Sequence, residues 1–109
     1  MPAVPDFTDQ ELHEFRKILT SHYGSEVEIQ LADCDLVLQP ESEETTGCPT
    51  VFWHQDGTNF VVFKTGNRAY RAQFFYTPHE QYGTDTLEYP SLTSCVNDIL
   101  ETRADHVRE

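Results

Sequence analysis

The sequence predicts an α+β fold in which a four- to five-stranded antiparallel meander is flanked by an N-terminal and a C-terminal helix (α-β-β-β-β-α). Three observations predict it. Segments with helical periodicity lie near both ends of the chain, the most apolar and strand-like stretch, residues 51–76, lies between them, and turn-forming pairs divide that stretch. Terminal helices packed mainly on one face of a meander would bury the apolar side of every element.

The bulk composition is typical of one folded domain. With 109 residues the chain can build its own hydrophobic core, so we expect a single domain over 1–109. Hydrophobic residues make up 38% and aromatic residues 12%, more than a disordered chain of this charge would have. No apolar run approaches the roughly 20 residues that cross a bilayer, and residues 1–24 lack signal-peptide character. We therefore expect a cytoplasmic protein without membrane insertion.

The first helix has clear signals at both ends. Residues 1–6 contain two prolines and are expected to form an extended arm. Thr8 and Glu11 have the spacing of a capping box, and Gly24 suits a left-handed C-cap, so the helix is predicted over 9–23. Its apolar residues recur at helical spacing: Leu12, Phe15, Ile18, Leu19 and Tyr23.

Turn chemistry divides the central stretch into strands. Asp56-Gly57 has the character of a type I′ hairpin turn, and Gly66-Asn67 also tolerates left-handed backbone. Upstream, the apolar alternation of residues 27–38 changes phase at Ala32-Asp33, which predicts either one bent strand with a bulge or a short hairpin. Residues 40–49, acidic and bounded by prolines, are expected to form a loop.

The C-terminal third contains a long connection and a helix. Residues 77–90 are rich in turn formers but also contain aromatic residues, so we expect a segment that lies over the edge of the core. The second helix is predicted to begin near Ser91 because an apolar stripe follows it, and the tail 102–109 is expected to fray.

The candidate site is the second face of the meander. Val61 and Phe63 alternate with Phe60 and Val62, so the middle strand is apolar on both sides. Aromatic and arginine side chains mixed on one sheet face are typical of binding surfaces. The candidate partner-binding residues on this hairpin and the following connection are Val61, Phe63, Lys64, Arg68, Arg71, Gln73, Phe75 and Tyr82.

These features favour a non-enzymatic protein-interaction module: a small acidic adaptor, assembly factor or inhibitor subunit that docks on a larger protein. The net charge of −12, from 19 acidic and 7 basic side chains, disfavours nucleic acid and allows a basic partner. Lys64, Arg68 and Arg71 would suit a carboxylate on the partner. A homodimer through this face is an alternative, as is a face covered by helices or curled into a half-barrel.

Other functions have weaker sequence support. A small-molecule-binding protein or small enzyme would need a pocket between the sheet, the C-terminal helix and the 77–90 connection. Mimicry of nucleic-acid charge is a third hypothesis. The carboxylate pairs are no more than this acidic composition provides, His13 and His22 form no i, i+4 pair with another histidine, and the three cysteines form no Cys-x-x-Cys pair. The sequence predicts free thiols and no catalytic residue, cofactor site or metal site.

Overall fold

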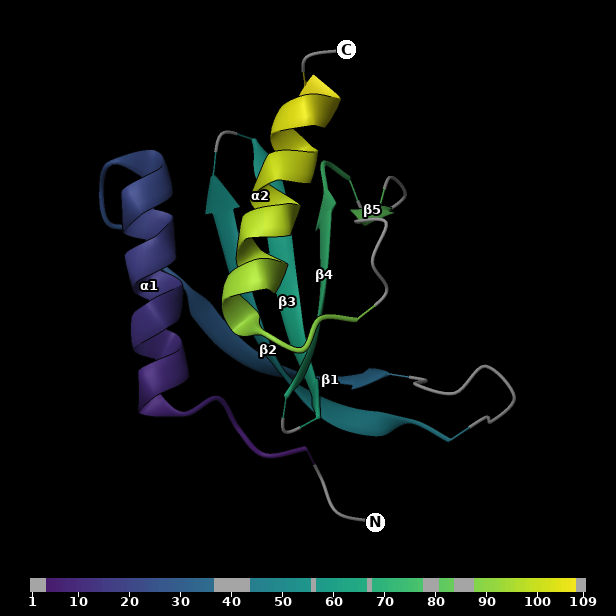
Figure 1. The fold of residues 1–109 in the computed structure, drawn as a ribbon. Coiled ribbons are helices and arrows are strands. Elements are labelled where there is room, and N and C mark those ends of the chain that lie inside the picture. The colour runs from purple at the N-terminus through teal and green to yellow at the C-terminus, as the bar shows by residue number, and fades with distance from the viewer. Residues whose placement is uncertain are drawn as a thin grey trace.

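A computed structural model describes residues 4–36, 44–55, 57–66, 68–77, 81–83 and 88–107, and the fold is drawn in Figure 1. Its elements are α1 (Asp9–Tyr23), β1 (Gln30–Leu36), β2 (Thr46–Gln55), β3 (Thr58–Gly66), β4 (Ala69–Phe75), β5 (Gln81–Gly83) and α2 (Leu92–Val107). This order confirms the predicted α+β fold, an antiparallel meander between two helices, and gives the sheet five strands.

Helix α1 has the predicted bounds and the predicted caps. The backbone N–H of Glu11 donates to Thr8 Oγ1 at 3.1 Å, and the N–H of Thr8 donates to Glu11 Oε1 at 2.8 Å, which completes the capping box. Gly24 ends the helix with a φ of 77°, a left-handed conformation that favours glycine. The local sequence therefore sets both ends of α1.

The five strands pair in chain order, each antiparallel to the next. In the β2–β3 hairpin, Gln55 lies opposite Thr58 and Gly57 has a φ of 74°, as the Asp-Gly turn predicts; Asp56 itself and Asn67 lie outside the described residues. A register shift between Lys64 and Gly66 disturbs the end of the β3–β4 ladder. The hairpin register fixes which side chains of neighbouring strands share a face.

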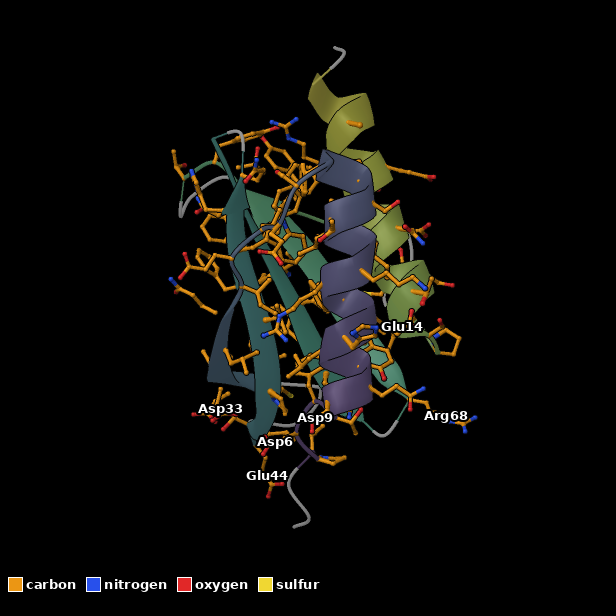
Figure 2. The ribbon with its side chains drawn as sticks, turned by 90° about the vertical axis from the view of Figure 1, so that its left-hand side faces the viewer. Asp6, Asp9, Glu14, Asp33, Glu44 and Arg68 are labelled. Carbon is orange, nitrogen blue, oxygen red and sulfur yellow. The ribbon has the colours of Figure 1, made fainter. Side chains whose placement is uncertain are left out.

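Strand β1 corrects the predicted bulge or hairpin. It pairs with β2 residue by residue from Gln30 opposite Phe52 to Leu36 opposite Thr46, so no extra residue lies at Ala32-Asp33. The lower part of this ladder instead bends out of the plane of the other strands, away from the helices (Figures 1 and 2). The apolar pattern therefore changes face along a continuously paired strand, without an inserted residue.

Two further boundaries differ from the sequence prediction. Strand β2 begins at Thr46, so the end of the expected 40–49 loop is strand, stabilised by its pairing with β1; residues 40–43 lie outside the described residues. Helix α2 continues to Val107, although a frayed tail is predicted from 102. Arg103 Nε donates to Thr58 Oγ1 at 2.9 Å, which ties this last part of α2 to the sheet.

The core lies between the two helices and one face of the sheet, the helix-side face. Trp53 stacks on Phe60 with ring centroids 4.8 Å apart, and Phe15 of α1 meets Trp53 edge-on at 5.2 Å. From the 77–90 connection, Tyr89 is buried and pairs with Tyr70, as expected for a segment over the core edge. Neither described helix is long and apolar enough to span a bilayer.

Figure 2 views the molecule along the edge of the sheet and separates its two faces. Both helices lie on the same side of the sheet, and the bent β1–β2 ladder extends to the other side. Among the described residues, no helix lies on that other side. The fold is therefore a two-layer arrangement with one sheet face left without a helical layer.

Candidate functional site

We call the sheet face that points away from the helices the second sheet face. Two rows of directly opposed residues cross it: Phe52, Val61 and Gln73 in one, and Thr50, Phe63 and Arg71 in the other. Residues opposite each other in antiparallel strands point to the same side, so each row is a continuous strip of side chains. Phe75, two residues beyond Gln73 on β4, extends the apolar part of this face.

The apolar residues of this face are neither core nor fully exposed. Phe52, Val61, Phe63 and Phe75 are half-buried, whereas Gln73 is exposed. On the helix-side face of the same strands, Phe60, Val62 and Phe74 are at most 1% exposed. A solvated sheet face normally alternates to polar residues, so three phenylalanines and a valine on this side indicate a surface suited to contact with another apolar surface.

The lower end of the second sheet face lies on the inside of the bend in the β1–β2 ladder. Cys48 and Thr50 of β2 are at most 2% exposed here, although no helix among the described elements covers them. The bend gives partial support to the half-barrel alternative, but the ladder order runs from β1 to β5 and remains open.

The guanidinium on the second sheet face already has an internal partner. Arg71 Nε lies 3.3 Å from Glu88 Oε2, and Thr65 Oγ1 donates to the same carboxylate oxygen at 2.9 Å. Glu88 precedes Tyr89, whose backbone pairs with Tyr70 and so holds the carboxylate beside β4. The charge of Arg71 is therefore balanced within the chain.

Lys64, predicted as part of the binding surface, lies on the helix-side face and is 2% exposed. Its Nζ contacts Glu11 Oε1 at 2.7 Å and donates to the backbone oxygen of Asp6 at 3.0 Å. The ammonium group also lies 5.8 Å from the centroid of the Phe7 ring. Lys64 therefore anchors the start of α1 and the preceding arm to β3, and it does not belong to the second sheet face.

Two other predicted residues also lie away from this face. Arg68 is exposed at the β3–β4 turn, and Figure 2 shows its side chain directed to the side of the helices. Tyr82 of β5 lies opposite Phe74, with ring centroids 5.3 Å apart, and packs at the edge of the helix-side core. Of the eight predicted residues, the second sheet face holds Val61, Phe63, Arg71, Gln73 and Phe75.

The buried polar cluster around Glu11 shifts two pKa values. Burial raises the pKa of Glu11, but hydrogen bonds from Lys64, Tyr70 and Thr8 outweigh it and leave the pKa below the ordinary value of 4.5. Burial, together with the hydrogen bond to the Glu11 carboxylate, raises the pKa of the Tyr70 phenol. Each group of the cluster has a complete structural role at the base of α1.

The sequence reasoning missed Phe52 and Glu88. The Asp-Gly turn contains a usable signal for Phe52, because a two-residue hairpin connection places Phe52 opposite Val61. Glu88 has no such signal, since its approach to Arg71 depends on how residues 88–90 return to the edge of the sheet. The local sequence thus predicts the apolar part of the face and not its charge balance.

A separate pocket opens at the other end of the molecule. It has a volume of about 310 Å³ and lies between the end of α1 (His22 and Tyr23), the β2–β3 hairpin (Gln55 and Phe60) and α2, which contributes Arg103. The sequence predicts a small-molecule pocket beside the 77–90 connection instead. The described lining contains no residue of that connection.

No group of three or more His, Cys, Asp or Glu side chains in the described part of the chain is arranged to hold a metal ion. No protein-family model, curated protein or solved structure matches this chain.

Proposed function

We propose that this protein is a non-enzymatic interaction module that binds a larger, basic protein through the second sheet face. The observation that carries the proposal is the set of four half-buried apolar side chains, Phe52, Val61, Phe63 and Phe75, on a face without a helical layer among the described elements. Apolar and aromatic centres with polar edges are the usual anatomy of protein interfaces. Such a module acts as an adaptor, assembly factor or inhibitor subunit.

The charge distribution supports a basic partner over a second copy of the chain. Arg71 is paired with Glu88, so the second sheet face offers little net positive charge. Figure 2 shows the exposed carboxylates of Asp33 and Glu44 near the lower end of the β1–β2 ladder, where Asp33, opposite Pro49, projects from the other face of β1 than Ala32 and Cys34. Two chains of net charge −12 would repel each other face to face, whereas a basic surface would be attracted.

The test compares Val61→Lys with Ser94→Lys as baits in native lysate of the source cells. The two variants have the same net charge, and Ser94 is exposed on α2. We expect the wild type and Ser94→Lys to retain the same basic protein, with less bound at higher salt, and Val61→Lys to lose it while its circular dichroism is unchanged. Equal capture by both variants would contradict the proposal. So would a wild-type homodimer that Val61→Lys abolishes.

A second candidate function is the binding of a small molecule in the pocket beside Arg103. Its volume of about 310 Å³ lies near the lower end of the usual range, and its lining combines the apolar ring of Phe60 with the polar groups of Gln55 and Arg103. A thermal-shift screen of metabolites tests this function. We expect a ligand that raises the melting temperature of the wild type and has no effect on Arg103→Met.

A further inference from the structure

Two of the three cysteines lie directly opposite each other in neighbouring strands. Cys34 of β1 pairs with Cys48 of β2 in the antiparallel ladder, and both thiols are free. Directly opposed residues in such a ladder have Cα atoms about 4.5–5.5 Å apart and side chains on the same face. Disulfides bridge Cα atoms roughly 4.4–6.8 Å apart, so the backbone already meets the distance requirement.

The two thiols differ in access to solvent. Cys34 is half-buried, whereas Cys48 is 0% exposed, and its Sγ donates to the backbone oxygen of Thr46 at 3.4 Å. Burial raises the pKa of the Cys48 thiol. An external reagent therefore reaches Cys34 first, while Cys48, on the neighbouring strand, is shielded from the reagent. This arrangement of an accessible thiol beside a shielded one is typical of a reacting and a resolving cysteine.

We propose that Cys34 and Cys48 form a redox modification site that closes a cross-strand disulfide when the protein meets a small disulfide such as oxidised glutathione. The sulfur of Cys34, after losing its proton to solvent, attacks one sulfur of glutathione disulfide. The disulfide bond of the reagent breaks, one glutathione thiolate leaves, and Cys34 carries a mixed disulfide.

The second step consumes the mixed disulfide. Cys48 rotates away from Thr46, gives its proton to water and attacks Cys34 Sγ, which releases the second glutathione. Two protein thiols are oxidised, and one glutathione disulfide is reduced to two thiols. The new bond fastens β1 to β2 at the lower, bent end of the ladder. The bond requires the strand register that brings Cys34 opposite Cys48, and it does not require the proposed partner.

Cys95 provides an internal control. It lies in α2, is 0% exposed, and has a pKa that burial, with a smaller contribution from Asp98, raises to about 12. Strand β1 provides a second control in Ala32, which is exposed, lies on the same face as Cys34 and is opposite Thr50. In Ala32→Cys/Cys34→Ser the new thiol is two residues out of register with Cys48, beyond the reach of a disulfide without backbone movement.

The experiment treats the full chain with oxidised glutathione and then alkylates it in denaturant before intact-mass analysis. We expect oxidation to remove the mass of two hydrogen atoms from the wild type and to leave one thiol open to alkylation. Peptide mapping should assign this alkylated thiol to Cys95. Cys48→Ser should stop at a glutathione adduct on Cys34, and both Cys34→Ser and Ala32→Cys/Cys34→Ser should form no intramolecular bridge. A stable adduct on the wild type, three alkylated thiols, a bridge to Cys95 or a disulfide-linked dimer would each overturn the proposal.

Discussion

Glu11 and Lys64 form an ion pair of 2.7 Å between the first turn of α1 and β3, although 53 residues separate them in the chain. The same carboxylate closes the capping box with Thr8 and accepts the hydroxyl of Tyr70. One side chain therefore caps the N-terminus of α1, balances a buried ammonium group and positions α1 on the sheet. This cluster ties α1 to β3 and β4 on the helix-side face, and it leaves the second sheet face as the surface for other contacts.

Lys64→Met should lower the free energy of unfolding by about 3 kcal/mol, because it leaves the Glu11 carboxylate partly buried without its cation. Lys17→Met is the matched control. Lys17 is exposed on α1, so we expect a change of about 0.5 kcal/mol or less. Urea denaturation of the two variants measures the difference, and equal effects would argue against a structural role for the buried pair.

The Glu11 carboxyl should make the protein acid-sensitive. Its pKa in the folded chain lies below the ordinary value of 4.5, so its stabilising effect is complete above that pH and is lost as the pH falls through the folded pKa. Tyr70→Phe removes one hydrogen bond that lowers this pKa. We expect the Glu11 titration, followed by carboxyl NMR shifts, to move to higher pH in Tyr70→Phe. An unchanged titration would show that the hydroxyl does not hold the carboxylate.

Val61 and Val62 give a direct comparison of the two sheet faces. Val62 is 0% exposed beneath the helices, and Val61 is half-buried on the second sheet face. Replacing Val62 by threonine buries a hydroxyl and should cost about 1–3 kcal/mol of folding free energy. Val61→Thr should cost less than about 1 kcal/mol, since its hydroxyl can reach water. Equal losses in thermal or urea unfolding would mean that the second sheet face is as closed as the core.

Glu88→Gln should separate folding from binding. The pair that Glu88 forms with Arg71 is partly exposed, and such pairs contribute about 0–1 kcal/mol, so the melting temperature should change little. The substitution leaves the guanidinium without its balancing charge on the proposed docking face. Binding of a basic partner should therefore weaken, with a slower association rate at low salt. A faster association in surface plasmon resonance would argue for an acidic partner.

Local signals predicted the parts of the fold that local chemistry determines. Thr8, Glu11 and Gly24 gave both ends of α1, and Asp56-Gly57 gave the β2–β3 hairpin and with it the parity that separates Val61 from Val62. In each case the residues that determine the structure are within a few positions of one another.

Long-range geometry explains what the sequence could not predict. The apolar phase change in β1 looked like a bulge, but β1 pairs with β2 residue by residue, and the lower part of this ladder bends instead. Lys64 looked like a surface cation, because its partner Glu11 belongs to a distant helix. The opposition of Cys34 and Cys48 likewise requires the β1–β2 register, across a connection whose residues 37–43 lie outside the described part.

Site-specific photo-crosslinking tests the docking surface most directly. A photoreactive amino acid replaces Gln73, which is exposed on the second sheet face, or Ser94, which is exposed on α2. Irradiation in native lysate should join the Gln73 derivative, and not the Ser94 derivative, to one basic protein that the unmodified chain displaces in competition. Crosslinking to that protein from position 94 alone, or from neither position, would contradict the assignment of the second sheet face as the binding surface.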